Sequence, residues 1–340
     1  MKLVSYLLED EDRLGIYVDG KVYDTLSLNE ELVDNMQDLL WEGEDGMEVL
    51  KAYDAKIKSG DIDASIGVDI NDLILLSPVP HPTSTRDAYA FRQHVAAARR
   101  NRGVEMIPEF DQFPIFYFTN HNSTYGPGDI DLMKDHMNKL DFELEIAIVV
   151  GKPGINIPVE EADDYIAGFM VYNDMSARVM QMEEMKLNLG PAKGKDFANA
   201  FGPFFVTPDE LASKLVPAKE GHHGRNYDLS MKCWVNGKQV SEGNVKDMDW
   251  TFAEILERVS YGTEIFPGDV IGSGTVGTGC FLELNGTGLR LDESYTPQWL
   301  KDGDVVDMEI DGLGKLSNTM RLVDHEYSVL AKKKQLSVVK

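Results

Sequence analysis

The sequence predicts a β-rich α+β fold, with a small N-terminal α/β domain over residues 1–75 and a larger domain over residues 76–340. Three observations predict it. A chain of 340 residues that is 43% hydrophobic can bury a large core. Short β-branched and aromatic runs alternate with Gly, Pro and Asn turns through the second part. Three prolines, at Pro78, Pro80 and Pro82, forbid a helix between the two parts and indicate a linker.

The N-terminal part predicts small β meanders followed by a helix. Residues 2–8 and 14–18 are apolar runs joined across a charged turn, and the turn pair Asp19-Gly20 follows them. A helix-like stretch extends from Asn29 to about Lys58.

The larger part opens with a predicted helix over residues 86–102, which Ser84 or Thr85 would cap and Gly103 would end. Strand-like runs follow it, and their density favours a mixed β-rich fold over a doubly wound parallel sheet. These runs are 114–118, 141–150, 166–173, 203–206, 231–235, 269–272, 281–284 and 305–310.

Charge and composition exclude several classes of partner. The 58 acidic and 33 basic residues give a net charge of -25, which repels nucleic acid and anionic lipid. No run approaches the roughly 20 apolar residues of a membrane helix, and the first twelve residues do not have a signal-peptide pattern. The two cysteines give no disulfide framework. We therefore expect a cytoplasmic protein that binds neither nucleic acid nor membrane.

Two carboxylates stand two residues apart in an apolar strand. Glu143 and Glu145 would share one face, about 7 Å apart, while Ile148 and the valines after it require burial of both faces. Like charges that lose their hydration repel unless a cation lies between them. An edge strand with a solvated face is the alternative.

Other segments carry further candidate catalytic or metal-binding groups. Asp174 follows an apolar strand, where a helix-cap role is the common alternative. Asp87 lies seven residues before His94, so in one helix both would share a face about 10 Å apart. For His94, a surface histidine is the alternative. Carboxylates alone favour Mg²⁺, Ca²⁺ or Mn²⁺ over zinc or copper.

Four features add to this set. Lys195 lies in a Gly- and Pro-rich loop that does not match a phosphate-binding P-loop. The run 268–275 ends in small residues that permit close approach of a ligand. Glu283 stands among apolar neighbours, where a histidine would be a suitable partner. Arg99, Arg100 and Arg102 are either a local attraction for an anionic substrate or a solvated helix end.

Five ordered motifs together resemble the fumarylacetoacetate hydrolase family, over about residues 75 to 325. They are Arg-Asp-x-Tyr-x-x-Arg-Gln-His at 86–94, Phe-Glu-Leu-Glu at 142–145, Asn-Asp-x-Ser-Ala-Arg at 173–178, Gly-Lys-x-Phe at 194–197 and Pro-Gly-Asp-Val-Ile at 267–271. The resemblance implies a mixed β-roll of the family's C-terminal type and a homodimer.

The resemblance also implies roles for individual residues. The metal ligands would be Asp87, Glu143, Glu145 and Asp174. The catalytic groups would be His94, Glu283 and Lys195. The substrate contacts would be Arg102, Tyr117, Arg178, Gln181 and Thr275. Met185 and Asn199 stand where the family pattern has tyrosine and threonine, which leaves the acyl half of the substrate open.

The implied activity is metal-dependent hydrolysis of a carbon–carbon bond in a 1,3-diketo acid, such as fumarylacetoacetate or an acylpyruvate. His94, oriented by Glu283, would activate water, and the cation and Lys195 would stabilise the enolate that leaves. Decarboxylation or isomerisation of an oxo acid such as oxaloacetate is the first alternative, and a non-catalytic metal-binding protein is the second.

Overall fold

The computed structural model describes residues 1–334 and is built around β-strands. The strands are β1 (Lys2–Leu8), β2 (Glu11–Val18), β3 (Lys21–Asp24), β4 (Val68–Asp69), β5 (Ile74–Leu75), β6 (Ser84–Ala88), β7 (Phe116–Thr119), β8 (Thr124–Tyr125), β9 (Gly128–Met133), β10 (Leu140–Asp141), β11 (Leu144–Val150), β12 (Ile166–Asp174), β13 (Ser176–Ala177), β14 (Asn199–Val206), β15 (Leu215–Pro217), β16 (Arg225–Tyr227), β17 (Ser230–Val235), β18 (Lys238–Asn244), β19 (Asp269–Gly272), β20 (Val305–Ile310) and β21 (Gly314–Asp324). The α-helices are α1 (Thr25–Leu28), α2 (Met36–Glu42), α3 (Glu44–Ser59), α4 (Arg92–Asn101), α5 (Val159–Ala162), α6 (Arg178–Glu184), α7 (Phe252–Ser260) and α8 (Phe281–Leu291).

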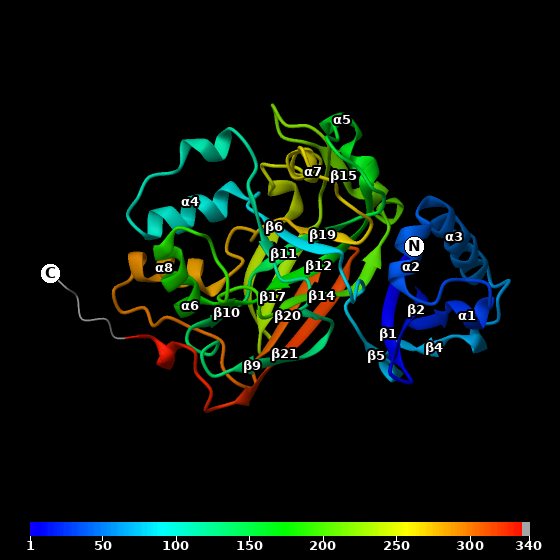
Figure 1. The fold of residues 1–340 in the computed structure, drawn as a ribbon, viewed down its shortest axis with the longest axis horizontal. Coiled ribbons are helices and arrows are strands. Elements are labelled where there is room, and N and C mark those ends of the chain that lie inside the picture. Colours follow the sequence, from blue (N-terminus) through cyan, green and yellow to red (C-terminus); the bar gives the residue numbers. More distant parts are fainter. Residues whose placement is uncertain (335–340) are drawn as a thin grey trace.

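Most strands belong to two sheets. The larger has twelve strands in the main order β4-β3-β2-β1-β14-β12-β11-β19-β6-β7, with β5 beside β1 and β8 beside β14. The smaller has five strands in the order β18-β17-β20-β21-β9. Figure 1 shows helices α4, α6 and α8 together on one side of the strands, with α1, α2 and α3 at the opposite end of the molecule. The predicted β-rich α+β fold with a mixed β-roll is confirmed.

The N-terminal region joins the larger sheet instead of forming a sheet of its own. Strands β1, β2 and β3 are the predicted meander, and β1 pairs antiparallel with β14 through Leu3 and Phe205. The segment 76–83 between β5 and β6 has no regular secondary structure, as the linker prediction requires. The division into domains at residue 75 stays a prediction.

Strand β11 separates two hydrophobic cores. Its side chains alternate, so that Ile146 and Ile148 pack in one core and Ala147 and Val149 in the other. Every residue of β11 is buried. Both faces of the strand are therefore covered, as the uninterrupted apolar run predicts.

The helix predicted over residues 86–102 is wrong in its first part. Residues 84–88 form strand β6, which pairs parallel with β19 and antiparallel with β7, and the helix α4 begins only at Arg92. The two strands on either side supply hydrogen bonds that override the local helix pattern. Asp87 therefore lies on strand β6 and His94 on helix α4. The two residues do not share one face of a single helix, as the sequence predicted.

Three other boundaries differ from prediction. The strand predicted over 141–150 is interrupted, because β10 ends at Asp141 and β11 begins at Leu144, so Glu143 lies outside the strand that carries Glu145. The run 281–284 is the first turn of helix α8 and not a strand, because a short apolar run does not distinguish the two by periodicity. The helix expected over residues 29–58 is two helices, α2 and α3, and begins later. Gly43, with φ of 67°, lies at the junction between them, a conformation that favours glycine. Within residues 1–334, each helix is too short or too polar to cross a bilayer.

Candidate metal centre and active site

The strand register brings three carboxylates onto one face of the larger sheet. Glu145 on β11 pairs directly with Tyr172 on β12, and Asp174 lies two residues further along that strand. Ala147, two residues after Glu145, pairs with Gly272, which in turn pairs with Asp87 on β6. Paired residues, and residues two apart, share a face. Three strands therefore direct Asp87, Glu145 and Asp174 to one place.

The three carboxylates meet at short range and out of solvent. Oxygen atoms of Asp87, Glu145 and Asp174 lie within 4.8 Å of one another, and each residue is at most 4% exposed. The backbone N–H of Gly274 donates to Asp87 Oδ1 at 3.0 Å and to Glu145 Oε2 at 3.1 Å. Gly274 has φ of +78°, and an added Cβ would meet the Ala88 carbonyl oxygen at 2.6 Å. Only glycine fits this close approach.

Burial and mutual repulsion dominate the electrostatics of this cluster. Burial, and then the charge of Asp174, raises the pKa of Asp87 to about 7. Burial, and then the charge of Asp87, raises the pKa of Glu145 well above its usual range. Burial also raises the pKa of Asp174, although Lys195 opposes the shift. Two causes, lost hydration and like charge, thus disfavour full ionisation of the cluster without a cation.

Glu143 lies beside the cluster between two cationic side chains. Its Oε1 accepts from Arg178 Nη2 at 2.8 Å, and its Oε2 forms an ion pair with Lys195 Nζ. Lys195 Nζ also pairs with Asp174 Oδ2 at 2.5 Å. Burial acts to raise the pKa of Glu143, but Lys195 and then Arg178 hold it below its ordinary value. Burial acts to lower the pKa of Lys195, whereas Asp174 and Glu143 raise it above its ordinary value, which favours the ammonium form.

The donor set fits a hard divalent cation. Asp174 Oδ1 is buried and accepts no hydrogen bond from the described residues. Three buried carboxylates, one of them with an orphaned oxygen, are an all-oxygen ligand set of the kind that Mg²⁺, Ca²⁺ and Mn²⁺ prefer. A cation there would relieve the repulsion that raises the three carboxyl pKa values. Glu143 is the fourth predicted ligand, but both of its oxygens contact protein cations in this geometry.

The two members of the predicted dyad contact each other. His94 in the first turn of α4 and Glu283 in the first turn of α8 are joined by a 2.6 Å contact between His94 Nδ1 and Glu283 Oε2, and both are buried. Ligand atoms of His94, Glu143 and Cys280 lie within 4.8 Å of one another, which places the dyad beside the carboxylates. A histidine whose Nδ1 donates to a carboxylate presents its other nitrogen, Nε2, as a base.

Of the five predicted substrate contacts, two touch the cluster directly. Tyr117 donates from its hydroxyl to Asp174 Oδ2 at 2.8 Å, and Thr275 Oγ1 approaches Glu145 Oε1 at 3.4 Å. Arg178 is 2% exposed, and its guanidinium bonds to Asp141, Glu143 and the Gln181 amide oxygen. This geometry fits a role in fixing Glu143 better than contact with substrate.

Among the described residues, Arg102 makes no hydrogen bond or ion pair with the carboxylate cluster. It is exposed at the end of α4, and its Nε donates to the Ala98 carbonyl. The assignment of these residues to substrate binding stays a prediction.

Sequence reasoning missed two residues of this region. Asp141 is fully buried and bonds to Arg178, and its signal was its place two residues before Glu143 in an apolar segment. Tyr89 packs its ring edge-on against His94 with 5.9 Å between centroids. Burial, and then the charge of Glu143, raises the pKa of Tyr89 to about 12. Its signal was its place in the Arg-Asp-x-Tyr motif, two residues after Asp87.

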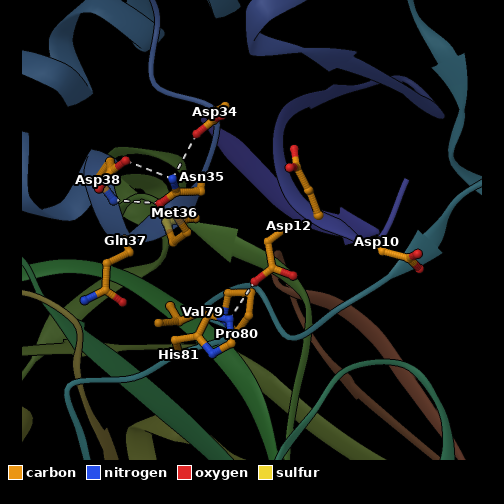
Figure 2. Close-up of a pocket in the computed structure, with 11 residues that line it drawn as sticks. Asp10, Asp12, Asp34, Asn35, Met36, Gln37, Asp38, Val79, Pro80 and His81 are labelled. Atoms are coloured by element: carbon orange, nitrogen blue, oxygen red, sulfur yellow. Dashed lines mark hydrogen bonds and ion pairs between the residues drawn. The ribbon is translucent and has the colours of Figure 1, made fainter. Parts of the chain in front are cut away.

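A cavity of about 740 Å³ lies elsewhere, between the β1–β2 turn, the start of α2 and the linker. Figure 2 shows its acidic side chains around open space, with His81 directed toward Asp12. His81 Nε2 lies 2.8 Å from Asp12 Oδ2. The residues that line the cavity are Asp10, Glu11, Asp12, Asp34, Asn35, Met36, Gln37, Asp38, Val79, Pro80 and His81. None of the predicted site residues is among them.

Comparison with known proteins gives the class of this protein. Residues 83–321 match the family described as Fumarylacetoacetate (FAA) hydrolase C-terminal. This match covers well over half of the chain and includes every predicted site residue. The protein belongs to the fumarylacetoacetate hydrolase family of enzymes.

Individual relatives span most of the chain. The oxaloacetate tautomerase YisK of Bacillus subtilis is 28% identical over 267 residues, 77% of each protein. A fumarylacetoacetate hydrolase structure from psychrophilic Exiguobacterium antarcticum is 25% identical with a TM-score of 0.67, covering 95% of this chain and 99% of that one. Maleylpyruvate hydrolase from Sphingobium sp. SYK-6, solved with manganese(II) and pyruvate, has a TM-score of 0.66 at 20% identity, covers 95% of this chain and 99% of that one, and shares the fold.

Proposed function

We propose that this protein is a divalent-cation-dependent enzyme that hydrolyses a carbon–carbon bond in a small 1,3-diketo acid. The observation that carries the proposal is the buried His94–Glu283 pair beside a buried carboxylate cluster. A cation site alone serves several reactions, whereas an oriented histidine base next to it provides for proton transfer at the substrate.

Asp87, Glu145 and Asp174 would hold the cation, and Glu143 would complete the set. Mg²⁺, Ca²⁺ and Mn²⁺ all suit these ligands. A divalent cation at this position supplies a Lewis acid for the oxygens of a 1,3-dicarbonyl group. Tyr117 and Gly274 orient the carboxylates from the protein side through the hydrogen bonds to Asp174, Asp87 and Glu145.

His94 acts as the base. Glu283 accepts the Nδ1 proton of His94, so Nε2 is free to take a proton from water. The water oxygen attacks the carbonyl carbon, and the bond between that carbon and its neighbour breaks. The electron pair of this bond passes to the departing enolate, whose carbon then takes the proton held by His94, so that the base is restored. Lys195, which stays protonated, stabilises the negative charge that develops.

Interconversion of the keto and enol forms of an oxo acid such as oxaloacetate is the second candidate. The similarity to the YisK oxaloacetate tautomerase favours it. His94 would then move a proton between carbon and oxygen of the substrate, and water would not attack. Decarboxylation of oxaloacetate is a variant of this candidate that depends mainly on the cation.

A substrate panel separates these functions. Purified protein, stripped with chelator, is tested on fumarylacetoacetate, acylpyruvates and oxaloacetate after addition of Mg²⁺, Mn²⁺ or Ca²⁺. Loss of diketone absorbance with release of two acids indicates hydrolysis, a change in the enol fraction alone indicates tautomerisation, and release of CO₂ indicates decarboxylation. Turnover of oxaloacetate without hydrolysis of any diketo acid would replace the first candidate with the second.

The His94→Ala variant tests the base directly. We expect its hydrolytic kcat to fall by about 10²- to 10⁴-fold, because general-base catalysis contributes that much. Calorimetric titration should show nearly unchanged affinity for the cation, since the three clustered carboxylates remain. Unchanged hydrolytic turnover in this variant would refute the dyad.

A homodimer in the cytoplasm is our further proposal, and light scattering of the purified protein tests the dimer.

A further inference from the structure

We propose that Asp141 is a positioning residue for the His94–Glu283 pair and acts through the N-terminus of helix α8. The inference rests on the proposed function for its kinetic readout. Asp141 lies on β10, is 0% exposed, and has both oxygens engaged by protein donors. Its two oxygens accept hydrogen bonds from two different parts of the active site.

Asp141 caps the helix that carries Glu283. Its Oδ1 accepts from the backbone N–H of Phe281 at 2.8 Å, and its Oδ2 accepts from that of Leu282 at 2.9 Å. Cys280, the residue before the helix, accepts the next N–H, that of Glu283, on its Sγ at 3.4 Å. The first N–H groups of a helix have no partner within the helix. Here side chains bind three of them in succession.

The same carboxylate also fixes the other half of the site. Asp141 Oδ2 accepts from Arg178 Nε at 2.8 Å and Nη2 at 2.7 Å. Arg178 Nη2 also donates to Glu143 Oε1 at 2.8 Å, and Glu143 pairs with Lys195. Asp141 therefore joins two groups of catalytic side chains, the dyad on α8 and α4 and the cations beside the carboxylate cluster.

Two physical arguments support a positioning role for Asp141. They are its negative charge at a helix N-terminus and the small displacement of catalytic groups that a reaction tolerates. An anion at a helix N-terminus is stabilised by the helix dipole, and a buried carboxylate is stable only when it is fully hydrogen-bonded. Asp141 meets both conditions. Because misplacement by about 1 Å can cost on the order of 100-fold in rate, the first turn of α8 must be held where Glu283 meets His94.

The milder test removes the thiol cap and restores it. Cys280→Ala deletes the acceptor for the Glu283 N–H, and we expect kcat to fall about 10-fold with KM and cation affinity changed less than about twofold. Cys280→Ser supplies a hydroxyl, a preferred N-cap group, and should restore kcat. Asn35→Ala, which removes the side-chain cap of helix α2 at the opposite end of the molecule, is the matched control and should lower the melting temperature without lowering kcat.

The stronger test is Asp141→Asn. The amide keeps the shape of the side chain but sets an NH₂ group against the N–H of Leu282 or the guanidinium of Arg178, both donors. We expect kcat to fall about 100-fold and the acidic limb of the kcat pH profile to move, because the partner of His94 is displaced. A purely structural role would lower stability and leave the profile of the folded enzyme in place.

Crystal structures of the variants decide the inference independently of activity. We expect the Glu283 carboxylate to lie beyond hydrogen-bond distance of His94 Nδ1 in Asp141→Asn, and to stay within that distance in Cys280→Ser. If the wild type converts no member of the oxo-acid panel, the proposed function fails while this structural readout still stands. An unmoved Glu283 in Asp141→Asn, or wild-type kcat in both Asp141→Asn and Cys280→Ala, would overturn the inference.

Discussion

Two acidic regions of this molecule differ in burial and in their neighbours. The cavity between the N-terminal region and the linker is lined by Asp10, Asp12, Asp34 and Asp38, which are exposed or half-buried, and none of its described lining residues is lysine or arginine. The cluster of Asp87, Glu145 and Asp174 is buried, and Lys195 pairs with Asp174 directly beside it.

The difference shows that the number of acidic residues does not make a cation site. Solvent screens the carboxylates of the cavity and hydrates each one, so their mutual repulsion is weak. Burial removes this hydration from the cluster and raises the pKa of all three of its carboxyl groups. Only the cluster has an electrostatic need for a cation.

Removal of one carboxylate from each region gives the largest expected effect. Asp174→Asn should weaken binding of Mn²⁺ by more than about 100-fold, which exceeds the loss typical for a residue outside the ligand set. Asp10→Asn, in the cavity, is the matched control and should leave binding unchanged. Isothermal titration calorimetry measures both. Equal affinities in the two variants would show that the cluster is not the cation site.

Addition of the cation should stabilise the fold through the cluster alone. A ligand that binds only the native state adds about 2.7 kcal/mol at 100 times its Kd. We expect urea denaturation of the chelator-treated wild type to show this gain after addition of Mn²⁺, and Asp174→Asn to show almost none. A similar gain in both proteins would place the bound cation elsewhere, for instance in the acidic cavity.

The smallest expected effect is a loss of folding stability at low pH that comes from a buried histidine, His136. The exposed histidine of the cavity, His81, is the comparison. His136 stacks on Phe197 with 4.1 Å between ring centroids and accepts the Met133 N–H on Nδ1. Burial, and then the charge of Lys193, lowers the pKa of His136 from 6.5 to about 4. The unfolded chain therefore takes up a proton first as pH falls, and stability is lost between about pH 6.5 and pH 4.

This loss should amount to about 1 kcal/mol at pH 5.5 relative to pH 7. His136→Asn keeps an acceptor for the Met133 N–H but has no titrating group. Between pH 7 and pH 5.5, the unfolding free energy of this variant should therefore fall by about 1 kcal/mol less than that of the wild type. His81→Asn, at a side chain that is 77% exposed, is the control and should follow the wild type. Identical pH dependence in His136→Asn and the wild type would contradict this prediction.

Local patterns predicted the neighbouring strands β1, β14, β12, β11 and β19 of the larger sheet, because each pattern is decided within a few residues, but missed others such as β9, β18 and β21. The predicted runs 141–150 and 269–272 contain β11 and β19, and turn residues lie around them. The run at 281–284 failed because a short apolar run does not distinguish a strand from a helix, and the cap of this helix, Asp141, lies 140 positions before Phe281. Residues 84–88 failed in the same way, through pairing with β19 and β7.

The sequence by itself determined the list of chemical groups, namely the four carboxylates Asp87, Glu143, Glu145 and Asp174, the His94–Glu283 pair and Lys195. Tertiary structure decided their relations. Strand register set Asp87, Glu145 and Asp174 on one face, whereas Glu143, in the segment between β10 and β11, lies between Lys195 and Arg178. Side-chain chemistry is a property of the residue, whereas distance, burial and pKa depend on segments that meet only when the chain folds.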